Sequence, residues 1–229
     1  MNTLTERTQP ETERFRSILN QFGADMRVTS PGIVQSFNAV KQTVTVQIAI
    51  REKINLNGVL SWKEIPILLD VPVFMPRAGE YILTFPIKPG DECLVVFGDN
   101  CMDAWYQSGG IQNQVDKRRH DLSDGYAIFG FWSQPRKITG YSTDTVQLRN
   151  ESGQDYIEID NHTVNIICGT INIKARDSIN MEAQNAINIK AQMAIDIEAN
   201  NKTVIENRNF ILHEHVRVQT GKDNTGEVA

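Results

Sequence analysis

Residues 171–202 read INIKARDS INMEAQNA INIKAQMA IDIEANNK when they are divided into blocks of eight. The first, third and fifth positions of each block carry apolar or small side chains: Ile171, Ile173, Ala175; Ile179, Met181, Ala183; Ile187, Ile189, Ala191; Ile195, Ile197, Ala199. Side chains two residues apart on a strand lie on one face. Each block therefore predicts a five-residue strand with an apolar inner face, followed by a three-residue corner.

The remaining strand positions of each block are polar and would face outward. The second position holds Asn172, Asn180, Asn188 and Asp196, and the fourth holds Lys174, Glu182, Lys190 and Glu198, so the charge alternates in sign. Opposite charges on stacked neighbours contribute roughly 0.2–1 kcal/mol per pair and oppose a slip of one block. We interpret these columns as structural patterning, with a glycan-binding stripe as the alternative.

One chain is too short to close a core with this repeat. A three-faced solenoid needs three blocks per coil, so four clear blocks and a degenerate one at 203–210 give fewer than two coils. Repeat folds need about three stacked units. Three chains around a common axis need only one block per chain at each level. The sequence thus predicts an obligate homotrimer, with a neck and an intertwined triangular β-prism over residues 137–210.

Residues 28–136 have the texture of a separate domain made of short strands. Val44, Val46, Ile48 and Ile50 alternate with polar residues, and further candidate strands lie within 64–75, 80–87, 92–98 and 125–132, between prolines and glycines. Closing such strands into a barrel removes exposed sheet edges. We therefore predict an all-β chain with an N-terminal OB-like barrel; a sandwich is the alternative.

The segment 1–27 contains one helical pattern. Phe15, Ile18, Leu19 and Phe22 form an apolar stripe over residues 11–26, and Gly23 marks the expected end of the helix. The first residues are polar, and no run approaches the ~20 apolar residues of a membrane-spanning helix. We expect synthesis in the cytoplasm without a signal peptide.

Composition argues against nucleic acid as a partner. The formal net charge is -5, whereas phosphate binding needs clustered Lys and Arg. The basic run Lys117, Arg118, Arg119, followed by His120, predicts a solvated turn. The cysteines, Cys93, Cys101 and Cys168, form no disulfide framework and no CxxC pair. We expect all three to be buried thiols.

The sequence HEH at 213–215 is the best candidate for a metal site. His213 and His215 would point to the same side of an extended strand, and Glu214 away from it. At the closing end of a threefold prism, within the apex segment 211–229, six imidazoles would converge. Six nitrogen donors favour an octahedral transition-metal ion over tetrahedral zinc or oxygen-bound calcium. We expect one structural metal ion per trimer.

A barrel, an eight-residue β-repeat, an H-x-H pair and a glycine-bearing tail together resemble the membrane-piercing central spike proteins of contractile-tailed phage baseplates. The most specific part is HEHVRVQTGKDNTG at 213–226, where His213, His215, Val218, Gly221, Thr225 and Gly226 fit the apex pattern of that family. The stretch PIKPGDECLVVFGDNCMDAW at 86–105 resembles its P-x-x-x-G-D-x-x-L-V-x-F and D-x-W pattern. Val216 and Arg217 stand where relatives often carry glycine.

The resemblance implies a mechanical function. It implies an iron ion held by His213 and His215 of three chains, and a trimer held in the tail-tube hub of the baseplate by its barrel and N-terminal segment. The prism would point at the host envelope from the tip of the virion's tail, and sheath contraction would drive it through the outer membrane. No lysozyme-like insert separates barrel from prism, so cell-wall hydrolysis is not implied.

Two other functions remain as alternatives. A trimeric receptor-binding fibre or adhesin would share the prism, but no aromatic residue follows His215, whereas adhesins usually end in a larger head. A β-helix enzyme that degrades polysaccharide needs convergent carboxylates in a cleft. The nearest candidate cluster is Asp121 and Asp124 beside His120, which loop composition explains equally well. We expect no catalytic residues.

Overall fold

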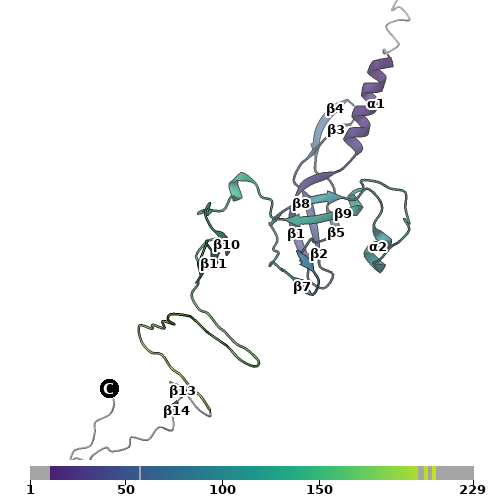
Figure 1. Ribbon diagram of the computed structural model, residues 1–229. Coiled ribbons are helices and arrows are strands. Elements are labelled where there is room, and N and C mark those ends of the chain that lie inside the picture. Colours follow the sequence, from purple (N-terminus) through teal and green to yellow (C-terminus); the bar gives the residue numbers. More distant parts are fainter. Residues whose placement is uncertain (1–10, 57, 201–203, 206–207, 210–229) are drawn as a thin grey trace, which may run out of the picture. The chain divides into compact units, whose positions relative to one another are not determined.

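The computed structural model describes residues 11–56, 58–200, 204–205 and 208–209. The chain divides into two compact units, residues 1–169 and 170–229. The first contains the helix α1 (Glu11–Asp25), a curled sheet and a smaller three-stranded sheet (Figure 1). The second contains, among its described residues, only the two-residue strands β13 (Val204–Ile205) and β14 (Arg208–Asn209). The described structure is mostly β, as the sequence predicts.

Five antiparallel strands form the main sheet. They are β1 (Thr29–Asn38), β2 (Thr43–Ile48), β5 (Leu68–Pro72), β8 (Glu92–Phe97) and β9 (Gly125–Phe129), in the order β5-β2-β1-β8-β9. Gly32 in β1 lies between Ile48 of β2 and Cys93 of β8. The long strand β1 therefore joins both halves of the sheet.

The two edge strands of this sheet meet. Val73, just after β5, forms a parallel bridge with Ala127 of β9, and the Phe74 amide donates to the Ala127 carbonyl over 2.9 Å. The five strands thus curl into a half-barrel, a name used below for these five strands and their core. This supports the predicted barrel over a sandwich, because a sandwich would leave these edges in two separate sheets.

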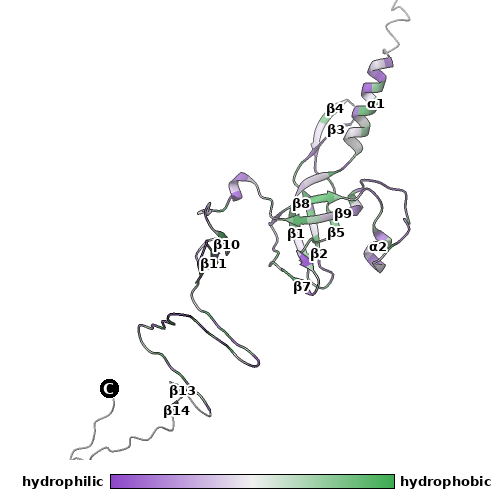
Figure 2. Ribbon diagram, in the orientation of Figure 1, coloured by the Kyte–Doolittle hydropathy of each residue, from purple (hydrophilic) through white to green (hydrophobic). Residues whose placement is uncertain are grey.

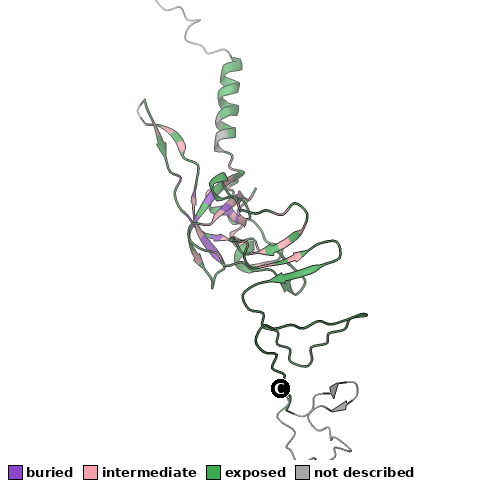
Figure 3. Ribbon diagram, turned by 90° about the vertical axis from the view of Figure 1, so that its left-hand side faces the viewer, coloured by how far each residue is buried: buried purple, intermediate pink, exposed green. Residues whose placement is uncertain are grey.

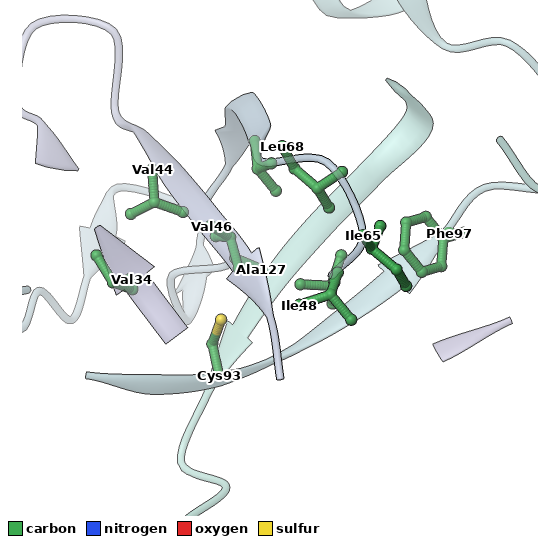
Figure 4. Close-up of a cluster of buried hydrophobic side chains, with 11 residues drawn as sticks. Val34, Val44, Val46, Ile48, Ile65, Leu68, Cys93, Phe97 and Ala127 are labelled. Carbon is green, nitrogen blue, oxygen red and sulfur yellow. The ribbon is translucent and has the colours of Figure 1, made fainter. Parts of the chain in front are cut away.

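The core of the half-barrel is aliphatic. Figure 4 shows most of its side chains, and Figure 3 shows that the buried residues gather in these strands. The buried hydrophobic residues of the cluster are Val34, Val44, Val46, Ile48, Ile65, Leu68, Val71, Cys93, Val95, Phe97 and Ala127. A Cβ at Gly32 would collide with Val46 and lie 3.1 Å from Val95, so glycine allows β1 to cross close to its neighbours.

Shorter elements extend from the half-barrel strands. The hairpins are β3 (Glu52–Leu56) with β4 (Val59–Lys63), and β6 (Arg77–Ala78) with β7 (Tyr81–Ile82). A six-residue helix, α2 (Asp103–Ser108), and the 3-10 turn η2 (Leu122–Asp124) lie between β8 and β9, and a second 3-10 turn, η3 (Gln134–Arg136), follows β9. The segment 80–87 was expected to form a longer strand, but only Tyr81–Ile82 pair.

Three details of the prediction were wrong. Helix α1 continues two residues past Gly23. Strand β2 ends at Ile48, so Ile50 is exposed rather than part of the alternation. No strand is predicted from the sequence at 29–38, because Ser30, Pro31 and Gly32 are typical of turns, yet these residues lie inside β1.

Candidate assembly surface

The smaller sheet of the first unit has one wholly aliphatic face. Its strands are β10 (Val146–Arg149), β11 (Tyr156–Ile159) and β12 (Val164–Ile167), paired antiparallel in that order. Residues directly opposite one another in a sheet lie on the same face. The register aligns two rows of three on that face, Val146 with Ile159 and Val164, and Leu148 with Ile157 and Ile166.

Local hydrogen bonds fix this register. Between β10 and β11 the Asn150 amide donates to the Asp155 carbonyl and the Gly153 amide to the Asn150 carbonyl, each over 3.1 Å. Gly153 has φ 71, a conformation that favours glycine. On the opposite face of the sheet, the Gln147 side chain donates to the Glu158 carboxylate over 2.7 Å. The face with Gln147 and Glu158 is mixed, since it also carries Tyr156 and Ile167, whereas the other face is wholly aliphatic.

The aliphatic face has no cover within the described chain. Its six residues are between 40% and 72% exposed to solvent. A three-stranded sheet gains independent stability only when a hydrophobic face is packed. This face, composed of Val146, Leu148, Ile157, Ile159, Val164 and Ile166, is called the aliphatic face below, and it is a candidate interaction surface.

The eight-residue repeat continues the same pattern. The chain bends at 168–169, 176–177, 184–185 and 192–193, and no helix, strand or turn is assigned between these bends. The last three bends fall on the sixth and seventh positions of the first three blocks, where the sequence predicts corners. The structure assigns no strand to residues 168–200. The strands expected in the repeat would pair with other chains, so a single chain does not test them.

The apolar columns of the repeat are exposed in the single chain. The first-position isoleucines Ile171, Ile179, Ile187 and Ile195 and the third-position residues Ile173, Met181, Ile189 and Ile197 keep between 51% and 73% of their exposure. Burying such a side chain contributes about 1.5–3 kcal/mol. Residues 171–200, called the repeat segment below, therefore carry a second unpartnered apolar surface with regular spacing.

The predicted metal ligands cannot be placed. His213 and His215 lie outside the described residues. Among the residues that are described, the side chains of Cys101, Asp103 and Asp124 offer ligand atoms within 4.8 Å of one another. Arg118 already engages both of these carboxylates, so a cation at this place would have to displace the guanidinium.

Asp124 is the centre of a buried ion-pair cluster. Its side chain is 0% exposed, and Arg118 donates to it twice, from Nε over 2.7 Å and from a terminal nitrogen over 3.0 Å. The Met102 amide donates to the same carboxylate over 2.9 Å, and Arg118 also lies 2.8 Å from Asp103. Hydrogen bonds to Asp124 and then to Asp103 raise the pKa of the Arg118 guanidinium. The cluster ties together three parts of the long β8–β9 connection, the start of α2, the loop at Arg118 and η2.

The other members of the candidate acidic cluster have separate roles. Asp121 accepts a hydrogen bond from the Ser123 amide over 2.9 Å, which caps η2 and lowers the pKa of the Asp121 carboxyl. The His120 ring lies 3.3 Å from Asp99. The structure brings Arg118 and Asp124 together and leaves Asp121 and His120 with other contacts, so Asp121, Asp124 and His120 do not converge as the candidate cluster would require.

Two predictions about this region need correction. Arg118 is not part of a solvated turn, because only 23% of its side chain is exposed and it pairs with a buried carboxylate. Cys93 and Cys101 are buried, as expected, and burial raises the pKa of the Cys93 thiol to about 11. Cys168 is exposed in the single chain, contrary to expectation.

No helix among the described residues is long and apolar enough to cross a membrane.

Comparison with known proteins found a family match for the half-barrel region. A search of curated proteins found no match. Residues 30–130 match the family described as the phage protein Gp138 N-terminal domain. The matched residues begin within β1 and end just after β9, so they coincide with the half-barrel and its connections. This match supports a phage structural protein with a Gp138-like N-terminal domain, consistent with a location in the virion.

Proposed function

We propose that this phage protein is a homotrimeric spike at the tip of a contractile tail, which punctures the host outer membrane mechanically. The observation that carries the proposal is the regular series of exposed apolar side chains from Val146 to Ile197, which no described part of the chain covers. The aliphatic face and the first and third columns of the repeat segment expose fourteen large apolar side chains in the single chain. Copies of the same chain are the simplest partners for surfaces of this regular kind.

Threefold symmetry would cover both surfaces at once. Three sheets β10–β12 placed around an axis enclose their aliphatic faces, and the repeat segments that follow complete one level of a prism at every eighth residue. The bends near the end of the blocks would supply the corners that such a prism needs. Enclosure would remove the apolar side chains from water, which is the main stabilising contribution to association.

A mechanical role follows from this architecture. Chains wound around one another cannot separate without breaking each level, and the alternating Lys and Glu column resists sliding by one block. Force from sheath contraction would act along the prism. We propose that the half-barrel and the N-terminal segment contact tail-tube hub proteins of the baseplate. No catalytic step is required for this role.

A metal ion is part of the proposal. His213 and His215 of three chains supply six imidazole nitrogens, a donor set that fits an octahedral transition-metal ion such as iron. The ion would contribute structural cross-linking of three strand ends, and the two histidines would hold it as neutral ligands.

Mass and metal content of the purified full-length protein test this proposal. We expect a particle of three times 25.9 kDa by light scattering or sedimentation equilibrium. A folded monomer would refute the spike. Elemental analysis should find one iron per trimer, which is lost in the double variant His213→Ala/His215→Ala while the mass stays trimeric. A metal-free trimer, or one with three ions, would refute the six-histidine site and leave the trimer standing.

Electron microscopy of the virion tests the location. A tag fused to the protein should label the distal tip of the tail. A trimer that binds purified envelope glycans tightly and labels lateral fibres instead would identify a receptor-binding fibre. Glycan cleavage that a single carboxylate substitution abolishes would identify an enzyme.

A further inference from the structure

The helix α1 carries an apolar stripe that nothing in the described chain covers. Phe15, Ile18, Leu19 and Phe22 keep between 64% and 66% of their exposure. Figure 2 shows hydrophobic and hydrophilic residues side by side along α1, and Figure 3 shows the helix as exposed where its burial is described. An isolated helix of fifteen residues is marginally stable in water. The helix therefore needs a partner to persist.

The spacing of the stripe matches a coiled-coil heptad. Phe15, Leu19 and Phe22 are separated by four and three residues, and Met26 continues the series after the helix end. These are a and d positions, with Phe15 and Phe22 at d and Leu19 at a. Ile18 then falls at g and widens the apolar face.

The charged residues of the first turns fit a parallel arrangement of copies. In this register Glu11 stands at g and Arg16 at e. A g residue of one helix in a parallel coiled coil lies beside the e′ residue five positions later in its neighbour. Glu11 of each copy would therefore meet Arg16 of the next copy. Within one helix these two residues are not neighbours, since only spacings of three and four bring side chains together.

We propose that α1 is a second oligomerisation element, which forms a parallel three-helix coiled coil with α1 of two further copies. This rests on the homotrimer of the proposed function, which sets the number and the direction of the helices. Cyclic symmetry makes the three helices parallel. The coiled coil would enclose Phe15, Leu19 and Phe22, and three Glu11–Arg16 pairs would flank it.

Hydrogen exchange of the full-length protein, followed by mass spectrometry, tests this directly. The readout is the protection of amides 11–25, with the β8 amides as an internal reference for the half-barrel. The variants Glu11→Arg and Arg16→Glu each place like charges at all three g–e′ contacts. Each should lower protection of α1 roughly tenfold, because three opposite-charge pairs are replaced by three like-charge pairs. The double variant Glu11→Arg/Arg16→Glu should recover it.

The chain offers a matched control at Glu13 and Arg14. In the proposed register these residues stand at the outward positions b and c. Glu13→Arg/Arg14→Glu and Glu11→Arg/Arg16→Glu both convert the two intrahelical pairs, Glu11–Arg14 and Glu13–Arg16, into like-charge pairs. Intrahelical effects are therefore equal in the two sets. The single variants Glu13→Arg and Arg14→Glu should leave protection within about twofold of the unaltered protein, since the charges they change do not face another helix.

The outcomes separate this inference from the proposed function. Protection of α1 that falls in the g and e single variants, returns in their double variant and survives in the controls supports the coiled coil. A trimer whose α1 amides exchange freely, or whose g–e variants behave as the controls do, refutes the coiled coil but not the spike. The former result would leave another protein as the partner of α1. A monomeric particle refutes both.

Discussion

The half-barrel strands and the repeat segment both alternate aliphatic with polar side chains. The aliphatic side chains are buried in the half-barrel and exposed in the repeat segment. Val46, Val95 and Ala127 are 0% exposed in the half-barrel, whereas each apolar residue of the first and third columns of the repeat is at least half exposed. In the half-barrel, strands far apart in sequence return to cover one another, as β1 does with β8. In the repeat segment each strand-length piece is followed by a bend and the next piece.

The difference shows that a period-two pattern specifies which face of a strand is apolar, but not which part of the same chain or of another chain packs against that face. A core can close within one chain only when connections bring strand edges together, as the bridge between Val73 and Ala127 does. The repeat has corners of three residues and too few levels to do this alone. We therefore interpret its apolar columns as a pattern for assembly, whereas the half-barrel core is buried within one chain.

The largest effect should come from a charge in an apolar column of the repeat. Ile187→Asp would bury three carboxylates at one level of the trimer, a cost that burial of apolar area cannot offset. We expect loss of the trimer by light scattering, with unchanged fluorescence of Trp62, Trp105 and Trp132, which all lie in the first unit. The neighbouring variant Asn188→Asp adds the same charge at an outward position and should remain trimeric. A normal trimer from Ile187→Asp would contradict the inward assignment.

The next largest effect should fall on the half-barrel. Arg118→Ala leaves Asp124 buried without its guanidinium partner, and breaking such a pair costs about 3–5 kcal/mol. Chemical denaturation followed by tryptophan fluorescence measures this loss. The matched variant Arg119→Ala removes an exposed arginine that pairs with exposed Asp99, and it should cost less than about 1 kcal/mol. Equal costs for the two variants would show that the cluster around Asp124 is not structural.

A smaller effect distinguishes the half-barrel core from its exposed hairpin. Val95→Ala deletes two methyl groups from a fully buried site and should lower the free energy of unfolding by about 2 kcal/mol. Val59→Ala makes the same deletion at an exposed position of β4 and should change it by less than about 0.5 kcal/mol. Neither variant should change the mass of the particle. A loss of trimer in Val95→Ala would mean that the half-barrel core depends on assembly.

The smallest effect should be a pH dependence at the exit from the half-barrel. Glu92 in β8 accepts hydrogen bonds from the Ser133 amide and hydroxyl, and the first of these is the main cause that lowers the pKa of its carboxyl. A lowered pKa in the folded state contributes stability above the ordinary carboxyl range, and this contribution is lost as pH falls through the folded pKa. Glu92→Gln should therefore flatten the acid side of the unfolding profile. Glu151→Gln, at an exposed turn, is the control and should keep the profile unchanged.

The sequence predicted the elements whose pattern is local. The alternation of Val44, Val46 and Ile48, the stripe on α1 and the spacing of the bends are all visible without neighbours. Strand β1 was missed because Pro31 and Gly32 are typical of turns, and only the close approach of Val46 explains glycine inside this strand. Strand β12 lies within the span predicted as neck and prism, but its pairing with β11 was not predicted, since it depends on register.

The candidate site was predictable to a smaller extent. The repeat indicated an assembly surface, but the aliphatic face of β10–β12 emerges only when Val146, Ile159 and Val164 are aligned by pairing. The buried charge of Asp124 was not predicted, because carboxylates are rarely buried unless paired and the pairing with Arg118 depends on how the connection folds back. The sequence has no local signal for such a partner.

The regular bends also determine which length changes the protein tolerates. A chain that turns at every eighth residue can gain or lose material without displacing its apolar columns only in multiples of eight. The Lys and Glu column doubles that unit, because removing residues 179–186 would set Lys174 beside Lys190, whereas removing 179–194 would set Lys174 beside Glu198. Sixteen residues are therefore the increment by which the proposed prism could be shortened or extended, in evolution or by engineering, with its charge alternation kept.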